Sequence, residues 1–205
     1  MLEDLLAIAH LIDREDDGSL SLTHIEWSAD EILLSLDVTT DRYPDIHRHW
    51  QVICARVREH SISLGLAYSL QLTDDHVLLW SHMTRRLSAY FSGKCEDLNG
   101  VIGALYGRHW ELTDGWIPFQ RFLNPNVQLA KLITGGSGML AEGPAPLMLA
   151  YEDVMQRFGF STSHLDAGEP AYWNGETWLE EREKLSALII DGSYIVAESF
   201  IAKKV

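Results

Sequence analysis

A run of alternating residues from Ile62 to Leu72 is the clearest pattern in the chain. Large apolar side chains stand at every second position, and small or polar residues stand between them. A period of two is the spacing of a pleated strand that buries one face. The run is long for one strand, and Gly65 is the position where it bends most easily. The pattern therefore predicts a curved antiparallel sheet whose apolar face is covered by helices or by a ligand.

Further strands are predicted on both sides of this run. Residues 19–27 and 31–40 alternate in the same way, and the short polar link between them predicts a hairpin. Residues 47–60 mix apolar and charged side chains on both faces, which is typical of a central strand covered at its middle. The series is completed by residues 76–82 and 87–92. Six consecutive strands predict an antiparallel meander.

The apolar spacing changes to the helical period in several other regions. Residues 2–12 predict a short amphipathic helix at the start of the chain. From Glu96 onward the spacing predicts a helix in which Gly103 and Gly107 leave a smooth groove for close packing against the sheet. Two more helices are predicted, at residues 119–134 and 146–158.

The end of the chain carries a hairpin signal. Residues 185–190 and 193–201 are rich in Ile, Val, Tyr and Phe, and Asp191-Gly192 between them tolerates the positive dihedral angles of a two-residue turn. Helix-favouring residues precede this segment, so the competing interpretation is a helix over 178–190. We expect that helix to end near Lys184 and a strand to follow.

These elements predict an α+β fold, because strands and helices are segregated along the chain. We expect an N-terminal helix, a curved antiparallel meander mainly in residues 19–92, a helical layer on one face mainly in residues 96–160, and a C-terminal β-hairpin over 185–201. A length of 205 residues with 46% apolar content is best matched by a single domain spanning residues 1–205.

Acidic residues outnumber basic ones by 30 to 16, which gives a formal net charge of −14. The excess lies on both flanks of the chain and would repel phosphate backbones, so we expect no nucleic-acid partner. A basic protein partner suits this charge, although an acidic surface also serves solubility alone. The N-terminal residues are acidic where a secretory signal is basic, and no apolar stretch is long enough to span a membrane. We therefore expect a soluble, cytoplasmic protein with no membrane partner.

Histidines supply one candidate metal site. His47 and His49 lie on the same side of an extended chain, which is how several sheet-based metal sites begin. A third ligand is available from His60, His76 or His82, all in the predicted sheet, and His76 is the one chosen here. The alternative is that these are surface or strand-end histidines, and no cofactor is predicted.

A glycine- and proline-rich connector supplies a second candidate. It begins with Gly135, Gly136, Ser137 and Gly138 and precedes a predicted helix, where backbone amides can bind an anion. The motif of a phosphate-binding loop is absent, and Met139 replaces the last glycine of a nucleophile elbow. We expect a structural turn between two helices, with a lid or a small-anion cradle as the functional alternative.

Aromatic residues supply the third candidate. Tyr172, Trp173 and Trp178 surround a polar Asn-Gly segment. Aromatic side chains in such a loop form binding surfaces for a sugar, a protein or another protomer. Alternatively they fold back over the sheet as an apolar plug, because tryptophan buries a large area.

The sequence thus predicts a non-catalytic protein of bacterial type that docks on another protein, as inhibitors and immunity proteins do. This hypothesis depends on the acidic surplus, the aromatic loop and the failure of every catalytic motif tested. The second hypothesis is a small-molecule or metal site between the sheet and the helices, with an enzymatic role as one form of it, that uses the three histidines or the Gly135 connector. The third is a structural subunit of a homo-oligomer.

Overall fold

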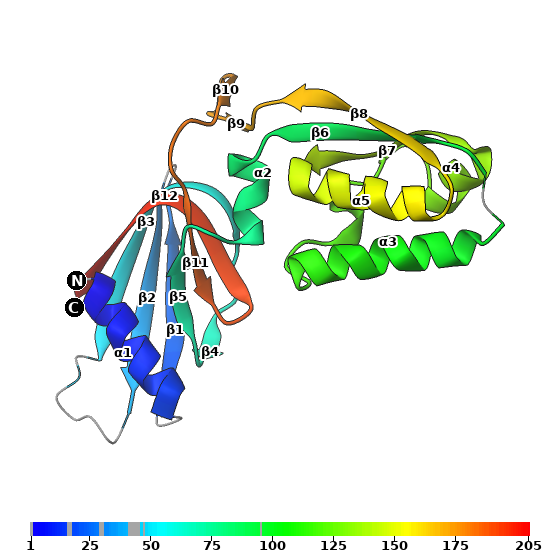
Figure 1. Cartoon of the computed structure of the whole chain (residues 1–205). Coiled ribbons are helices and arrows are strands. Elements are labelled where there is room, and N and C mark those ends of the chain that lie inside the picture. Colours follow the sequence, from blue (N-terminus) through cyan, green and yellow to red (C-terminus); the bar gives the residue numbers. More distant parts are fainter. Residues whose placement is uncertain (1, 16–17, 29–30, 41–45, 47, 95) are drawn as a thin grey trace. The chain divides into compact units, whose positions relative to one another are not determined.

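The computed structural model describes residues 2–15, 18–28, 31–40, 46, 48–94 and 96–205 (Figure 1). It divides into two compact units: unit 1 comprises Met1–Leu79 and Arg182–Val205, and unit 2 comprises Trp80–Glu181. The predicted α+β class, with a curved antiparallel sheet and a C-terminal hairpin, is confirmed. That residues 1–205 act as a single domain stays a prediction. Every helix in the described part of the chain is too short or too polar to span a lipid bilayer.

Unit 1 is built on a seven-stranded sheet in the order β4-β1-β2-β3-β12-β11-β5, and all neighbouring strands are antiparallel. The two edge strands, β4 and β5, are separated in the chain only by Tyr68 and Ser69. The sheet must therefore curl until its edges meet at this corner. The strands are β1 (Ser19–Trp27), β2 (Glu31–Thr39), β3 (His49–Ser61), β4 (Gly65–Ala67), β5 (Leu70–Thr73), β11 (Ser186–Ile190) and β12 (Ser193–Lys204).

Helix α1 (Leu2–Glu15) packs on the core face of this sheet (Figure 1). Leu5, Ala9 and Ile12 repeat at helical spacing and are buried against the inward residues of the strands. Strand β2 shows the matching period of two, since Ile32, Leu34, Leu36 and Val38 are buried and the residues between them are not. Cys54 lies in the same core, and burial raises the pKa of its thiol to about 12.

The alternating run near Gly65 folds differently from the prediction of one long strand. Ala67 pairs with the buried Leu20 and is itself buried, so its neighbour Leu66 points outward and is 66% exposed. Beyond the Tyr68-Ser69 corner the buried side chains shift from odd-numbered to even-numbered positions, and Leu70 is buried in the core. The reason is that the chain crosses here from one sheet edge to the other, which exchanges the two faces.

Asp191 fastens this corner to the C-terminal hairpin. Its Oδ1 accepts hydrogen bonds from the Ser69 amide at 2.9 Å and the Ser69 hydroxyl at 2.7 Å, and its Oδ2 accepts one from the Tyr68 amide at 2.9 Å. Asp191 lies in the turn between β11 and β12 with φ of +49°. The predicted hairpin around Asp191-Gly192 is confirmed, and its turn also holds the two sheet edges in place.

A charged cluster bridges β3 and β12 where their register shifts between Val196 and Ala197. Glu198 accepts hydrogen bonds from Arg58 Nη2 at 2.6 Å and from Arg56 Nη1 at 2.8 Å. The Arg58 side chain is only 6% exposed, whereas that of Arg56 is 66% exposed. The Glu198 carboxylate therefore accepts hydrogen bonds from one buried and one exposed guanidinium at the same time.

Unit 2 has a three-stranded antiparallel sheet in which β6 (Arg86–Ser92) lies between β7 (Ser137–Pro144) and β8 (Ser161–Gly168). Helix α5 (Ala145–Arg157) packs on this sheet, and α3 (Leu98–Thr113) packs on α5 (Figure 1). Leu87, Ala89 and Phe91 of β6 supply the sheet side of the core. The shorter elements are η1 (Val77–Leu79) in unit 1, and α2 (Trp80–Met83), η2 (Phe119–Arg121) and α4 (Leu129–Gly135) in unit 2.

Several predicted elements are wrong in type or extent. Residues 77–83 are helical where a strand over 76–82 was predicted, because the adjacent Leu78 and Leu79 are both buried and cannot share one face of a strand. Strand β6 belongs to the sheet of unit 2, so the six predicted strands do not form one meander. The predicted helix over 119–134 forms only at its two ends, on either side of a segment that contains Pro125. Trp178–Glu180 forms a strand where a helix was expected.

The glycines of α3 do not serve close packing as predicted. Apart from the adjacent residues and the backbone of α3 itself, no heavy atom lies within 4 Å of the position that a Cβ would occupy at Gly103 or Gly107. The buried face of this helix is formed instead by Val101, Leu105 and His109.

Candidate functional site

The aromatic segment of the sequence forms a small hairpin in unit 2, made of β9 (Ala171–Trp173) and β10 (Trp178–Glu180). Its turn is closed by Asn174, whose side-chain oxygen accepts hydrogen bonds from the amides of Glu176 at 2.9 Å and Thr177 at 2.8 Å. Gly175 adopts a φ of +103°, which few other residues tolerate. Local turn chemistry therefore determines where this hairpin forms.

Trp173 and Trp178 face each other across the hairpin. Their ring centroids are 5.8 Å apart in an edge-to-face arrangement, a geometry worth about 1 kcal/mol beyond its area burial. Trp173 nevertheless remains 53% exposed and Trp178 67% exposed. The two indoles thus brace the hairpin and still present most of their surface outward, which does not fit the alternative of a buried plug.

The strand register determines which side chains share a face with the indoles. Cross-strand partners lie on one side of a sheet, so Glu180 and Ala171 lie on the face of Trp173 and Trp178. Tyr172 occupies the opposite face and is half-buried. The tryptophan face therefore carries a carboxylate beside two aromatic rings.

The surrounding sequence is strongly acidic. From Glu169 to Glu181 the chain has four glutamates and no lysine or arginine. Indole faces attract cations through their quadrupole, and carboxylates add a longer-range attraction. Aromatic centres with a polar rim are typical of protein-binding hot spots. The hairpin therefore presents two exposed indoles within a locally acidic stretch of the chain.

The end of β8, just before the tryptophan hairpin, is held in place by an ion pair between Asp166 and Arg85, which we call the charged clamp. Arg85 forms two hydrogen bonds with the Asp166 carboxylate, one of them from Nε to Oδ1 at 2.9 Å. The Gly168 amide also donates to Asp166 Oδ1, at 3.0 Å. These contacts stabilise the charged carboxylate and lower the pKa of Asp166 to about 2.

The clamp should make the stability of unit 2 depend on pH in acid. An unfolded aspartate has a pKa of about 4, so the lowered folded value favours folding above that pH. This contribution is lost as the pH falls from about 4 toward about 2. We expect the Asp166→Asn variant to lack this part of the acid-unfolding profile, measured by circular dichroism. An NMR titration that places the Asp166 midpoint near its unfolded value would contradict the clamp.

The histidine candidates do not assemble into a metal centre in the described part of the chain. His47 lies outside the described residues. His49 Nδ1 lies 2.8 Å from Asp37 Oδ1 on the exposed end of β3. His76 precedes η1, and its Nδ1 accepts a hydrogen bond from the Leu78 amide at 3.3 Å. No group of three or more His, Cys, Asp or Glu side chains among the described residues could hold a metal ion.

The glycine-rich candidate is not an open loop. Gly135 ends α4, and Gly136 caps that helix with φ of +82° while its amide donates to the Ile133 carbonyl. Ser137 and Gly138 begin β7 and pair with β6. The predicted turn between two helices is wrong, because a strand lies between them and its backbone is used in the sheet.

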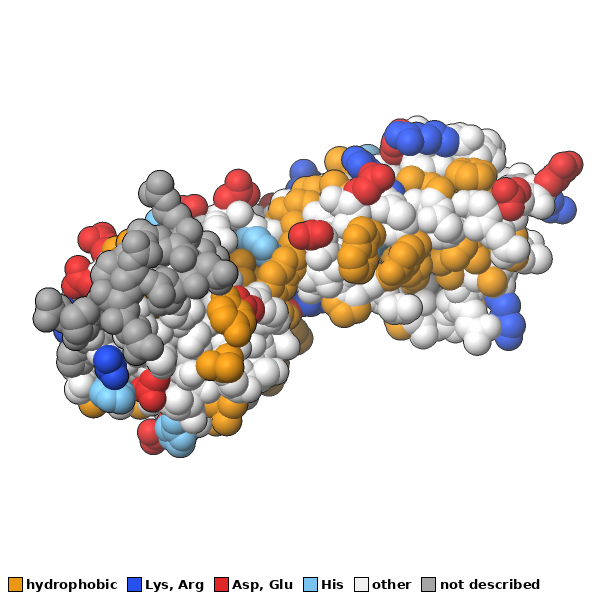
Figure 2. Space-filling view, turned by 90° about the horizontal axis from the view of Figure 1, so that it is seen from below, with side chains coloured by type: hydrophobic (Ala, Val, Ile, Leu, Met, Phe, Trp, Pro, Cys, Tyr) orange, Lys and Arg blue, Asp and Glu red, His pale blue; other side chains and the backbone are white. Residues whose placement is uncertain are grey.

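One exposed aromatic pair was not among the predicted site residues. Tyr106 and Trp110 on α3 are 50% and 52% exposed, and their ring centroids are 6.4 Å apart. Figure 2 shows hydrophobic side chains gathered on the face of unit 2 that α3 forms. Spacing by four residues, out of phase with the buried Leu105 and His109, is the sequence signal that marks this pair. Neighbouring Arg108 and Glu111 pair with each other at 3.0 Å.

No protein-family model matches this sequence, and no curated protein or solved structure matches it.

Proposed function

We propose that this chain is a non-catalytic docking protein that binds a basic partner through the Trp173–Trp178 hairpin. The main support is the arrangement of the two tryptophans in an acidic segment. Each indole is more than half exposed, and the two rings contact each other edge to face. An inhibitor or immunity-like role in the bacterial cytoplasm is the concrete form that we favour. The buried, protonated thiol of Cys54 is compatible with a reducing compartment.

The geometry supports tight binding by a small surface. Tryptophan is enriched among residues whose truncation costs most at interfaces. The indoles are already ordered by each other and by the Asn174 turn, so little conformational entropy is lost when a partner covers them. The glutamates attract a basic partner from a distance and accelerate association.

The α3 aromatic pair is a weaker candidate for this role. It exposes comparable aromatic area, but the Arg108–Glu111 ion pair beside it supplies no net charge for a basic partner. Trp110 is therefore the natural matched control for the hairpin tryptophans.

The test is capture followed by affinity measurement. The immobilised protein is exposed to a bacterial extract, the retained protein is identified by mass spectrometry, and its dissociation constant is measured by biolayer interferometry. We expect Trp173→Ala/Trp178→Ala to weaken binding by about 100-fold and Trp110→Ala to change it by less than about threefold. Raising NaCl from about 0.05 to about 0.5 M should slow association and leave dissociation little changed.

Two results would contradict the proposal. One is a retained partner whose affinity does not depend on the hairpin tryptophans. The other is a partner with an acidic surface and association that salt does not slow.

A further inference from the structure

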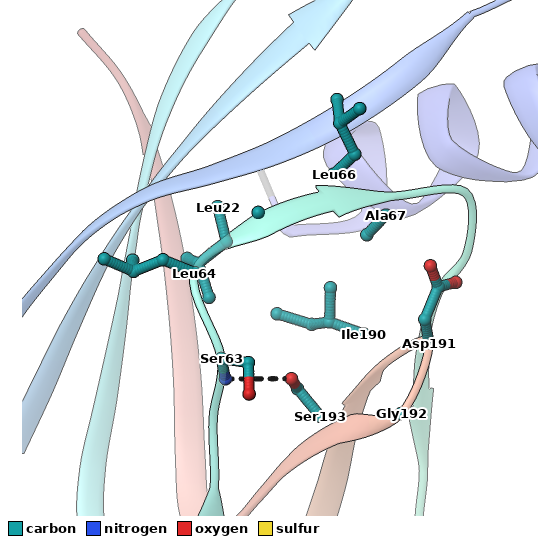
Figure 3. Close-up of a pocket in the computed structure, with 10 residues that line it drawn as sticks. Leu22, Ser63, Leu64, Leu66, Ala67, Ile190, Asp191, Gly192 and Ser193 are labelled. Atoms are coloured by element: carbon teal, nitrogen blue, oxygen red, sulfur yellow. Dashed lines mark hydrogen bonds between the residues drawn. The ribbon is translucent and has the colours of Figure 1, made fainter.

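A pocket of about 290 Å³ opens in unit 1 beside the turn between β11 and β12 (Figure 3). Buried apolar residues form part of its wall, namely Leu22, Ala67 and Ile190. Figure 3 shows the Ile190 side chain directed into the hollow and the Asp191 carboxylate at its edge. The pocket therefore combines an apolar wall with an acidic group at one side.

Asp191 is the only charged residue in the three chain segments that line this pocket. Residues 19–23, 61–73 and 185–197 contain no other Asp or Glu and no Lys, Arg or His. The rest of the mouth is lined by serines and glycines, which are polar or expose backbone but carry no charge. One carboxylate therefore determines the sign of the charge at this site.

The charge of Asp191 is stabilised but not neutralised. Its three hydrogen bonds come from the amides of Tyr68 and Ser69 and from the Ser69 hydroxyl, which are all neutral donors. No Lys, Arg or His in the described part of the chain forms an ion pair with it. A carboxylate has about four acceptor sites, so Oδ2, which accepts one bond, keeps one free. A cation in the pocket would meet an uncompensated negative charge and an available oxygen.

Charge and size limit the class of ligand. The formal charge of −14 raises the local concentration of cations and lowers that of anions. A water molecule takes up about 30 Å³ in the liquid, so the pocket has room for about ten non-hydrogen atoms. A metal ion needs several oxygen or nitrogen ligands, and no metal-ligating group of three side chains exists among the described residues. An organic cation of modest size fits these limits.

We propose that this pocket, which we call the Asp191 pocket, binds a small primary amine with an apolar body. The ammonium group donates a charge-assisted hydrogen bond to Asp191 Oδ2, and the apolar body covers Ile190 and Leu22. The apolar contact favours such a compound over a simple cation, and the carboxylate favours it over a neutral compound. This site does not depend on the tryptophan hairpin or on the docking function proposed above.

Amide NMR titrations of the full chain with phenethylamine test the proposal. This probe carries an ammonium group on an apolar body of the size that the pocket admits. We expect saturable binding with a dissociation constant of about 0.1–1 mM, which is ordinary for so small a ligand. The shifted amide signals should be concentrated at residues 63–67 and 190–193.

Two related probes each lack one part of this ligand. In 2-phenylethanol a hydroxyl replaces the ammonium group, and methylamine keeps the ammonium group without the apolar body. Both should bind at least about tenfold more weakly than phenethylamine. This comparison uses the unaltered chain, so it does not depend on the stability of any variant.

Asp191→Asn identifies the carboxylate. Asparagine removes the charge and tolerates the same backbone conformation, so unit 1 should keep its fold. Phenethylamine should bind this variant at least about tenfold more weakly, whereas 2-phenylethanol should bind it as it binds the wild type. Asp114→Asn in unit 2 is the matched control, because Asp114 has a φ of +47° against +49° for Asp191. It should leave phenethylamine binding unchanged.

Each opposite result overturns the proposal. Without saturable binding up to about 10 mM, the pocket does not take this class of ligand. If methylamine binds as tightly as phenethylamine, or Asp114→Asn weakens binding equally, the acidic chain attracts cations without a specific site. If 2-phenylethanol binds as tightly, or Asp191→Asn changes nothing, the carboxylate does not select the ligand. Signals that shift only outside the two segments assign the binding to another surface.

Discussion

Replacing Glu198 by alanine is expected to lower the free energy of unfolding of unit 1 by about 3 kcal/mol. The change removes the carboxylate that holds both Arg56 and Arg58. The Arg58 side chain is only 6% exposed, so its guanidinium would lose this carboxylate without gaining water in its place. Removing one partner of a buried charge pair costs far more than the pair itself contributes, because the remaining charge keeps its desolvation penalty and loses an attractive contact.

The two arginines provide internal controls for this prediction. Arg56→Ala removes an exposed partner of the same carboxylate and should cost less than about 1 kcal/mol. Joint replacement, Arg58→Met with Glu198→Leu, should recover part of the loss, since both charges of this pair are removed together. Urea unfolding followed by NMR signals of unit 1 is the appropriate measurement, because a chain with two units need not unfold in one step. Equal costs for Glu198→Ala and Arg56→Ala would contradict the burial of Arg58.

Asp191→Ala should destabilise unit 1 by about 2–3 kcal/mol. Three hydrogen bonds to the Tyr68-Ser69 corner disappear, and alanine must adopt the left-handed conformation that aspartate tolerates better. Amide hydrogen exchange at Tyr68 and Ser69 should accelerate in the same variant, because both amides lose their acceptor.

Two substitutions at the same position separate these causes. Asp191→Asn keeps the left-handed conformation and one oxygen acceptor, so it should be the mildest change. Asp191→Gly keeps the conformation and loses all three hydrogen bonds, so it should fall between asparagine and alanine. An alanine variant as stable as the asparagine variant would show that the corner does not depend on this carboxylate.

Much of unit 1 follows from local patterns in the sequence. Local sequence alone predicts several elements: the spacing of apolar residues predicts α1, β1 and β2, and Asp191-Gly192 predicts the turn of the C-terminal hairpin. The period around Gly65 indicated extended structure correctly but gave the wrong face for Leu64 and Leu66. Alternating apolar and polar residues show that the two faces of a strand differ. Which face is buried depends here on the path of the chain from one edge of the sheet to the other.

Unit 2 was harder to predict because its sheet depends on distant pairing. Strand β8 has mostly exposed side chains and therefore carries no apolar alternation, although it pairs with β6 along its length. Strand β7 begins with glycine-rich residues that resemble a loop. Both strands are specified by contact with β6 and not by their own composition.

The tryptophan hairpin was predicted only as a cluster of residue types. Its composition indicated a binding surface, but the pairing of Trp173 with Trp178 and the position of Glu180 beside them follow from the register. The histidine hypothesis used the same kind of evidence, and His49 is instead placed beside Asp37. Residue types mark candidates, and their distances decide among them.

The order of strands in unit 1 has a consequence for synthesis. Strand β12 follows all of unit 2 in the sequence, yet it lies between β3 and β11 in the middle of the sheet of unit 1. A growing chain therefore holds one edge of β3 unpaired until β12 has been made, whereas every residue of unit 2 is made earlier. The inserted unit can complete its fold first, and unit 1 must wait for β12.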